Sequence, residues 1–336
     1  MKAAPSHYTL NTGTRAIRSG PNRVATAVNP DTGCVVTVFP ERRPALSLPD
    51  NHWTIFMTDG FSWPQGNLVA IGGAEDKTSD LDILARVFEL APCHSRDVAV
   101  IATASGIPEE VLPPYEAAFK RLGAATVHAL PVRDRRAASN AETVAAIERC
   151  GAIFFTGGDQ LRLTHVLGGS PLLEAIRARY QAGAVVAGTS AGAAAMATTM
   201  IYNGDAADCL HKGAVKMTTG LAFVEGVTID SHFLERGRFT RLMEVGATNP
   251  ELLGVGLGED AGVIIHPGNV LEAIGTGHVI IVDNTQIAGS NITEIAQGDP
   301  VAVEHVILHA LIAGHGYDTQ ARRYLIPEGL AARLGE

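Results

Sequence analysis

The stretch AVVAGTSAG (184–192) decides how this chain folds. It begins with a short apolar run of the kind found in a buried strand. Two glycines, Gly188 and Gly192, flank Ser190 where that run ends, and the small residues that follow predict a helix over 191–199. A strand that turns sharply into a helix at G-x-S-x-G is the context of a nucleophile elbow, in which the serine hydroxyl projects from the strand end. The sequence therefore predicts a strand–turn–helix unit with Ser190 at its turn.

Similar apolar runs alternate with helical patterns on the N-terminal side of this unit. Such alternation is typical of a doubly wound, mostly parallel sheet covered by helices, so the predicted fold class is α/β. The predicted strands are 68–73, 98–105, 125–132, 152–159 and 184–190, and the predicted helices are 80–90, 109–122, 141–150 and 171–181.

The two ends of the chain have a different texture. After about residue 213, short strands joined by Gly, Asn and Pro turns predict an antiparallel flank on the same sheet, interrupted by one helix near 237–247. Residues 1–66 carry little periodicity beyond two possible strands, at 35–39 and 53–57. They are interpreted as an N-terminal extension, with a partly disordered leader as the alternative. The expected division is an extension at 1–66 and an α/β domain at 67–336.

Composition excludes several classes of protein. The 336 residues carry a formal net charge of −9, which argues against a general nucleic-acid binder. With 46% hydrophobic and 18% charged residues, the chain can bury a large core. No two of its four cysteines have a CxxC spacing, so no thiolate metal site is expected. The sequence offers no signal peptide and no run of about 20 strongly apolar residues, which predicts a cytoplasmic protein without a membrane span.

Ser190 needs a base, and the base needs an acid that orients it. His232 follows the predicted strand GVTID (226–230), and strand ends are where α/β active sites collect. Glu259 and Asp260 follow the strand GVGLG (254–258) in the same way. The backbone N–H of Ala191 would lie where an oxyanion forms. A plain glycine turn, a structural histidine and an ordinary acidic turn remain the alternative readings.

Two further features could bind anions. The glycine turns Gly72-Gly73 and Gly157-Gly158 follow strands and could present backbone N–H groups to a substrate, although neither is a nucleotide-binding fingerprint. In both turns the acid that follows, Asp76 or Asp159, has an alternative role as a helix cap. Three arginines lie just after His232 at spacings that can converge on carboxylates, or that can form a solvated basic face. They are Arg236, Arg238 and Arg241.

Five sequence blocks in a fixed order together resemble one family. The blocks are IGGAEDK (71–77), FTGGDQ (155–160), GTSAGA (188–193), DSHFLERGRFTRL (230–242) and GVGLGEDAGVI (254–264). In these blocks the chain is similar to the cyanophycinases, which are serine peptidases of family S51 and relatives of aspartyl dipeptidases. The resemblance implies a flavodoxin-like fold related to class I glutamine amidotransferases. It also implies hydrolysis of cyanophycin, a poly-aspartate that carries arginine on each side-chain carboxyl, to β-Asp-Arg dipeptides.

The resemblance assigns roles to residues. Ser190 would be the nucleophile, His232 the base and Glu259 the orienting acid, with oxyanion contacts from Gly157, Gly158 and Ala191. The family uses no cofactor or metal and is commonly homodimeric. The substrate pocket would be lined by Gln160, Asp230, Ser231, Arg236, Arg238 and Arg241, with Asp230 holding a substrate guanidinium. Ser231 and Gly258 depart from the family pattern, which commonly has Gln and an acid at these positions.

Three alternatives stay open from the sequence. An aspartyl or isoaspartyl dipeptidase would share the Ser–His–Glu set but would take a short substrate. A catalytically silent peptide-binding protein could use the same fold. An ordinary esterase is the weakest alternative, because its acid would precede the histidine in the chain, as in most α/β-hydrolases.

Overall fold

The computed structural model describes residues 16–17, 25–28, 35–38, 66–268 and 270–335, and the chain separates into two compact units, Met1–Ser62 and Trp63–Glu336. In the first unit the strands β1 (Ala16–Ile17), β2 (Ala25–Val28) and β3 (Val35–Val38) form an antiparallel sheet. β3 falls on the strand predicted at 35–39. The strand predicted at 53–57 lies outside the described residues.

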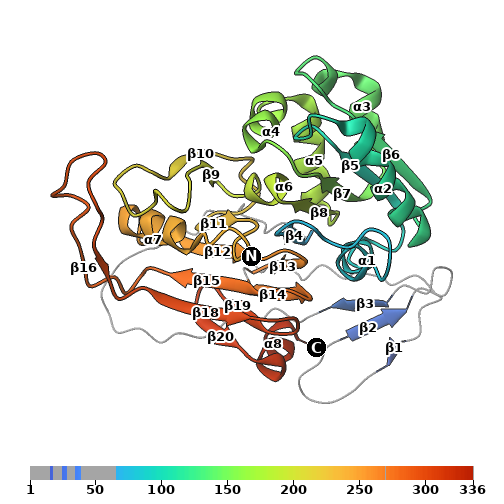
Figure 1. Ribbon diagram of the computed structural model, residues 1–336. Coiled ribbons are helices and arrows are strands. Elements are labelled where there is room, and N and C mark those ends of the chain that lie inside the picture. Colours follow the sequence, from blue (N-terminus) through green and yellow to red (C-terminus); the bar gives the residue numbers. More distant parts are fainter. Residues whose placement is uncertain (1–15, 18–24, 29–34, 39–65, 269, 336) are drawn as a thin grey trace, which may run out of the picture. The chain divides into compact units, whose positions relative to one another are not determined.

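The second unit is built on a nine-stranded sheet with the order β20-β19-β14-β13-β4-β8-β7-β5-β6 (Figure 1). Its five strands from β4 to β6 are parallel, and each falls on one of the predicted apolar runs. The predicted α/β class with a mostly parallel, doubly wound sheet is therefore confirmed. The parallel strands are β4 (Leu68–Ile71), β5 (Asp97–Ile101), β6 (Thr126–Leu130), β7 (Cys150–Phe155) and β8 (Val185–Thr189).

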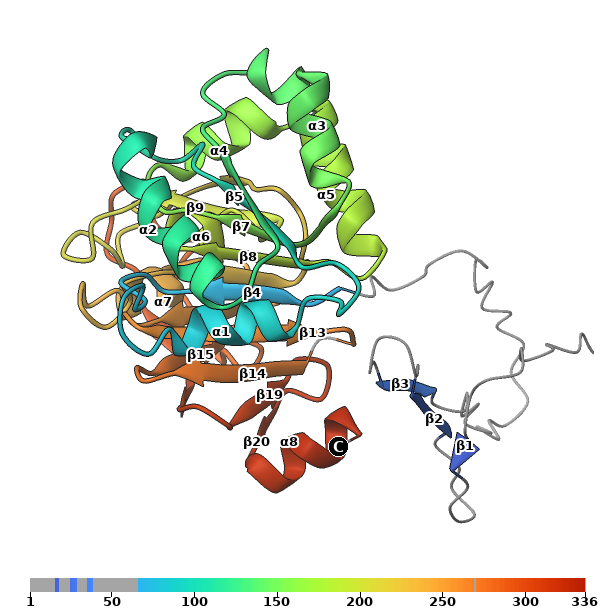
Figure 2. The same ribbon diagram turned by 90° about the vertical axis from the view of Figure 1, so that its right-hand side faces the viewer.

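Alternate residues of the parallel strands face two different sets of helices. Val98 and Val100 pack in one core cluster with α1 (Asp82–Glu89) and α2 (Pro108–Arg121), which cross in front of the sheet in Figure 2. Ala99 and Ile101 belong to the cluster on the other face. There the sheet is covered by α3 (Ala141–Ile147), α4 (Gln160–Leu167) and α5 (Pro171–Gln181).

Two helices differ from the sequence-based expectation. α4 was not predicted; it begins directly after β7, where the Asp159 side chain accepts the N–H groups of Leu161 and Arg162 as an N-cap. The helix predicted over 191–199 is only the short α6 (Ala191–Ala194). It ends early because the carbonyl oxygens of Ala195 and Met196 accept hydrogen bonds from backbone N–H groups of the 221–224 loop. In a longer helix the same carbonyl oxygens would accept N–H groups of the helix itself.

The C-terminal part completes the large sheet and adds a second one. β13 (Ala261–His266), β14 (Val270–Gly275), β19 (Gly316–Asp318) and β20 (Arg323–Leu325) extend the large sheet as the expected antiparallel flank. Four further strands form a second sheet, which packs on the large sheet through a shared hydrophobic core. It contains β11 (Val227–Asp230), β12 (Leu253–Leu257), β15 (Val279–Asp283) and β18 (Ile307–Leu311).

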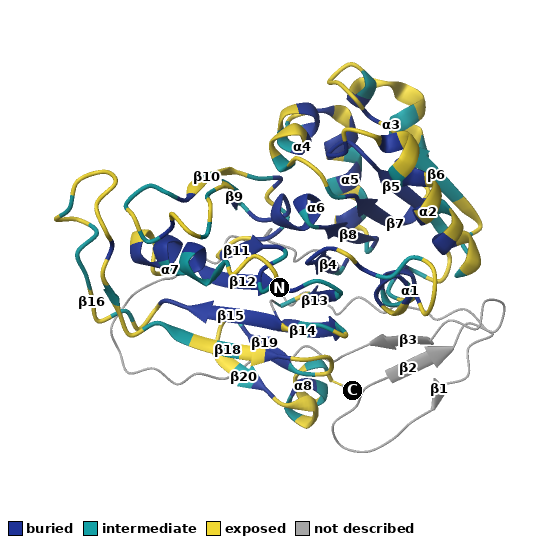
Figure 3. Ribbon diagram, in the orientation of Figure 1, coloured by how far each residue is buried: buried dark blue, intermediate teal, exposed yellow. Residues whose placement is uncertain are grey.

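Within the four-stranded sheet, β11 and β12 are parallel neighbours, which the sequence did not predict. The physical reason is α7 (Phe239–Thr248), which crosses between them and packs on the outer side of this sheet through Leu242 and Val245. β11 and β12 are fully buried, whereas β18 is largely exposed at the sheet edge (Figure 3). The parallel pairing brings the carboxyl ends of β11 and β12 to the same edge.

The remaining elements lie around this framework. They are the 3-10 helix Ala137–Ser139, the hairpin β9 (Thr199–Asn203) with β10 (Lys216–Thr219), the pair β16 (Gly289–Ser290) with β17 (Val303–Glu304), and α8 (Pro327–Leu334).

Among the described residues, no helix combines the length and the apolar character needed to cross a membrane.

Candidate active site

Ser190 occupies a strained turn between β8 and α6. Its φ is +52°, a conformation that a residue with a side chain adopts only where its surroundings enforce it. The two flanking glycines, Gly188 and Gly192, allow the close backbone packing that enforces this conformation of Ser190. A Cβ atom at Gly188 would lie 2.7 Å from the carbonyl carbon of Gly192, and one at Gly192 would lie 2.5 Å from the Phe155 oxygen. The turn thus has the sharp geometry that the G-x-S-x-G pattern predicted.

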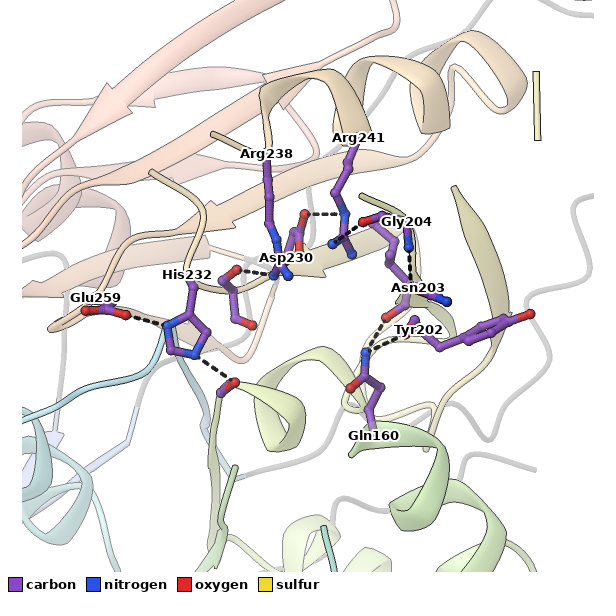
Figure 4. Close-up of polar contacts among 12 residues, drawn as sticks. Gln160, Tyr202, Asn203, Gly204, Asp230, His232, Arg238, Arg241 and Glu259 are labelled. Carbon is purple, nitrogen blue, oxygen red and sulfur yellow. Dashed lines mark hydrogen bonds and ion pairs between the residues drawn. The ribbon is translucent and has the colours of Figure 1, made fainter. Parts of the chain in front are cut away.

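His232 lies directly in front of this serine. Its Nε2 is 3.0 Å from the Ser190 Oγ, and its Nδ1 is 2.7 Å from an Oε of Glu259 (Figure 4). The backbone N–H of His232 donates to the Gly72 carbonyl at 2.9 Å. At Gly73, φ is +117° and a Cβ atom would lie 2.3 Å from the imidazole Cε1, so the glycine provides the space for the ring. The Gly72-Gly73 turn therefore supports the histidine.

The structure shows which of the two adjacent acids, Glu259 or Asp260, contacts the histidine. Glu259 contacts His232, whereas the carboxylate of Asp260 accepts a hydrogen bond from the Thr276 hydroxyl. The backbone of Asp260 has φ +46°, and its N–H donates to the Gly73 carbonyl at 2.9 Å. His232 follows β11 and Glu259 follows β12. Because these strands are parallel neighbours, both side chains reach the same edge of the sheet.

The Gly157-Gly158 turn faces the serine from the end of β7. A Cβ atom at Gly157 would lie 3.4 Å from the Ser190 Cβ and 3.9 Å from its Oγ, so the backbone of Gly157 lies next to the serine side chain. Gly158 has φ +139°, and a Cβ there would lie 2.2 Å from the Ala104 carbonyl oxygen. Gly158 and Ala191 line a cavity together with Ser190, which brings the three predicted oxyanion residues to one place.

A cavity of about 170 Å³ beside Ser190 contains every residue predicted for the substrate pocket, and we call it the arginine pocket. The Gln160 amide is held at its edge, because its Nε2 donates to the carbonyls of Ile201 and Tyr202 at 3.1 and 3.2 Å. Its predicted members are Gln160, Asp230, Ser231, Arg236, Arg238 and Arg241.

Asp230 is buried and is held by two of these arginines (Figure 4). Its carboxylate oxygens lie 3.2 Å from Arg238 Nη1 and 3.1 Å from Arg241 Nε, the latter without the alignment of a hydrogen bond. Burial raises the pKa of Asp230, and the two guanidiniums counteract that rise. Burial also lowers the pKa of Arg238. The Asp230 carboxylate is thus engaged by guanidiniums of its own chain, rather than standing free for one of the substrate.

A second cavity, of about 550 Å³, adjoins the arginine pocket and shares Gly158, Ser190 and Arg236 with it. We call it the second pocket. It is lined by four side chains that sequence reasoning did not assign to the site. Two of them lie in the IGGAEDK block (71–77), which was noted for its glycines, and the other two lie in α2, which carried no such signal. These side chains are Glu75, Lys77, Glu110 and Tyr115.

Glu75 is a buried carboxylate next to the nucleophile turn. It accepts hydrogen bonds from the hydroxyls of Tyr115 and of Thr189, the latter at 2.6 Å, and Lys77 Nζ lies 3.3 Å from its Oε1. Burial, together with the negative charge of Glu75, raises the pKa of Tyr115 well above its ordinary value. Because Thr189 precedes Ser190, this cluster joins the β4 loop and α2 to the end of β8.

In the described residues, no group of three or more His, Cys, Asp and Glu side chains is arranged to hold a metal ion.

The chain is similar to one family of peptidases and to several curated proteins. Residues 68–272 match the family described as Peptidase family S51. A curated cyanophycinase of Geminocystis herdmanii is 38% identical over 253 residues, which cover 75% of this chain and 92% of that protein. The cyanophycinase of Nostoc sp. is 36% identical over 259 residues, covering 77% and 87%. That of Thermosynechococcus vestitus is 33% identical over 286 residues, covering 85% and 88%.

A solved structure shares the fold. The crystal structure of a peptidase from an acI-B1 Actinobacterium superposes with a TM-score of 0.58 at 21% identity, over 75% of this chain and 96% of that one. At this identity the likeness shows the α/β architecture alone.

Proposed function

The chain belongs to peptidase family S51, and from this premise we propose that it degrades cyanophycin to β-Asp-Arg dipeptides with Ser190 as the nucleophile. One observation carries the proposal: the unbroken series of contacts from Ser190 through His232 to Glu259, at 3.0 and 2.7 Å, beside a cavity rich in arginine. A serine, a base and an orienting acid within hydrogen-bond distance form the constellation that acyl transfer requires.

In the first step His232 Nε2 accepts the proton of the Ser190 hydroxyl as the oxygen attacks the scissile carbonyl. Glu259 accepts a hydrogen bond from the Nδ1–H group of the imidazole, which fixes the tautomer that leaves Nε2 free as a base. When the imidazolium forms, the same carboxylate stabilises its charge. The imidazolium then returns the proton to the leaving amine, and water hydrolyses the acyl-enzyme by the same base. The 2.7 Å contact between Glu259 and Nδ1 supports this assignment.

The backbone N–H groups of Gly157, Gly158 and Ala191 are the proposed donors to the oxyanion. Gly157 lies next to the Ser190 side chain, and Gly158 and Ala191 line the same cavity as Ser190, which supports this assignment. Loss of one such donor in a serine hydrolase typically costs about 3 kcal/mol of transition-state stabilisation.

The arginine pocket is proposed to bind substrate carboxylates. Arg238 and Arg241 are already paired with Asp230, whereas Arg236 forms no ion pair in the described part of the chain. Arg236 is therefore the first candidate to take a substrate carboxylate, with the other two contributing positive charge from the cavity wall. Asp230 holds these two guanidiniums in place instead of serving as the partner of a substrate guanidinium.

We further propose, from the similarity to the family, that residues 67–336 form the peptidase domain and residues 1–66 an extension. A homodimer that acts in the cytoplasm without a cofactor completes the proposal. Size-exclusion chromatography with light scattering tests the oligomeric state, and a mass of one chain would refute the dimer.

The experiment that tests the function compares wild type with Ser190→Ala on insoluble cyanophycin, with soluble products identified by mass spectrometry. Wild type is expected to release β-Asp-Arg and Ser190→Ala to release none. Ser139→Ala is the matched control, because Ser139 is exposed and lines neither cavity; its activity should equal that of wild type.

Two outcomes would contradict the proposal in different ways. Release of β-Asp-Arg by both wild type and Ser190→Ala would remove Ser190 from the nucleophile role. No release by wild type would refute cyanophycin as substrate. Aspartyl and isoaspartyl dipeptides would then be tested as substrates. Their cleavage would indicate a dipeptidase, and the absence of cleavage would indicate a peptide-binding protein.

A further inference from the structure

We propose that the second pocket binds one arginine branch of the substrate as a zwitterion, with Lys77 taking the carboxylate of the branch and Glu110 its guanidinium. This inference rests on the proposed function and extends it to a cavity that lies outside the arginine pocket. The second pocket reaches Ser190 and His232 directly, so a branch bound there belongs to a residue next to the scissile bond.

Lys77 presents a fixed cation. Its ammonium donates to the Glu75 carbonyl oxygen at 2.8 Å, lies 3.3 Å from the Glu75 carboxylate, and stands 5.2 Å from the centre of the Tyr115 ring. One of its three N–H donors is thereby used on the Glu75 carbonyl, and the ammonium keeps donors for a ligand. Glu75 itself is buried and also receives the Tyr115 and Thr189 hydroxyls, so it positions Lys77 instead of binding substrate.

Glu110 presents an uncompensated anion in the same cavity. It lies in the first turn of α2, is exposed, and has no ion pair or side-chain hydrogen bond among the described residues. Its neighbour Glu109 differs from it in two ways: the Glu109 carboxylate forms an ion pair with Arg133 at 2.9 Å, and Glu109 does not line the cavity. Of these two adjacent carboxylates, only Glu110 has its charge free for a ligand.

The chemistry of the branch matches this pair of charges. A β-Asp-Arg unit joins the aspartate side-chain carboxyl to the arginine α-amino group, which leaves one carboxylate and one guanidinium on each branch. The arginine pocket, with three guanidiniums around a single buried carboxylate, suits carboxylates alone. The second pocket offers both signs, and a carboxylate pairs well with the planar donors of a guanidinium. Arg236 lines both cavities and is available to a carboxylate between them.

The test uses a soluble peptide of three β-Asp-Arg units and three versions in which a different single branch carries citrulline, the neutral counterpart of arginine. Wild type is expected to cleave one of the three versions with kcat/KM about tenfold below that of the parent peptide, which is the effect of one charged hydrogen bond. Glu110→Gln should cleave the parent peptide and that version equally well. Its loss on the parent should lie in KM. Glu109→Gln, the matched control, should behave as wild type.

The failures of the two proposals are distinguishable. If wild type cleaves all four peptides equally, or if Glu110→Gln keeps the wild-type preference for arginine over citrulline, the zwitterion site is wrong while the peptidase activity stands. If wild type cleaves none of the peptides and no cyanophycin, the proposed function falls and this inference falls with it.

Discussion

Asp230 and Glu75 are both buried carboxylates close to Ser190, and the protein compensates them in opposite ways. Asp230 is 3% exposed and is held by two guanidiniums, those of Arg238 and Arg241. Glu75 is 2% exposed and receives two neutral hydroxyls and one ammonium. Asp230 lines the arginine pocket, and Glu75 lines the second pocket.

The difference teaches what each carboxylate holds in place. A buried ion pair carries a large desolvation cost that only its partner charges offset, so Asp230 and its arginines depend on one another. Hydroxyl donors carry no charge, so the Glu75 cluster depends less on any single member. Asp230 thus maintains a set of charges at a cavity wall, while Glu75 ties the residue before the nucleophile to α2.

The largest effect on stability should come from Asp230→Asn. This change leaves the buried guanidinium of Arg241 without its charge partner, and breaking a buried pair costs about 3–5 kcal/mol. We expect the free energy of unfolding, measured by urea denaturation, to fall by that amount. In the double variant Asp230→Asn/Arg241→Gln, removal of the orphaned charge should recover part of the loss. A loss under 1 kcal/mol in the single variant would show that the arginines do not need Asp230.

A smaller effect is expected for Glu75→Gln. The amide can still accept one hydroxyl, but Lys77 loses its charge partner and one polar contact is mismatched, which costs about 1–3 kcal/mol of unfolding free energy. Glu110→Gln is the matched control in the same cavity; because it is exposed and unpaired, its stability should stay within about 0.5 kcal/mol of wild type. A larger loss for Glu75→Gln than for Asp230→Asn would reverse the comparison.

The part of the fold that the sequence predicted well is the part in which single segments carry their own signal. The five parallel strands are buried on both faces and are therefore apolar runs, as at Val185–Thr189 and Cys150–Phe155. What the sequence did not reveal depends on contacts between distant segments. The end of α6 is determined by N–H groups from the 221–224 loop, and the parallel pairing of β11 with β12 depends on where α7 packs.

The same limit applies to the site. Ser190 was predicted from a local turn, and the structure brings every other residue assigned with it to the same edge of the fold. The choice between Glu259 and Asp260 could not be made from residues alone, because each follows the strand equally; it depends on which side chain faces His232. No local pattern indicates the role of Glu75, because its partners Tyr115 and Thr189 are distant in sequence.

The smallest effect is expected at Asp76, a partly exposed residue that directly follows Glu75. Its oxygens accept the N–H groups of Leu81, Thr78, Ser79 and Asp80, and these hydrogen bonds hold its pKa far below the ordinary value of 3.8. A carboxyl whose pKa falls on folding adds stability above its unfolded pKa, and that stability is lost as pH falls through the folded pKa.

Asp76→Asn keeps an acceptor oxygen but removes this pH dependence. Urea midpoints measured for wild type and Asp76→Asn should differ by a constant amount above about pH 5. They should converge as the pH drops below about 4, because there the Asp76 carboxyl of the unfolded chain takes up a proton while that of the folded chain stays ionised. The exposed Asp80→Asn is the control in the same loop, and its difference from wild type should show no such convergence. A gap between wild type and Asp76→Asn that stays unchanged down to about pH 2.5 would mean that the loop needs the shape of this side chain and not its charge. Convergence would show that Asp76 uses its charge to hold backbone N–H groups, whereas Asp230 uses its charge to hold other charges.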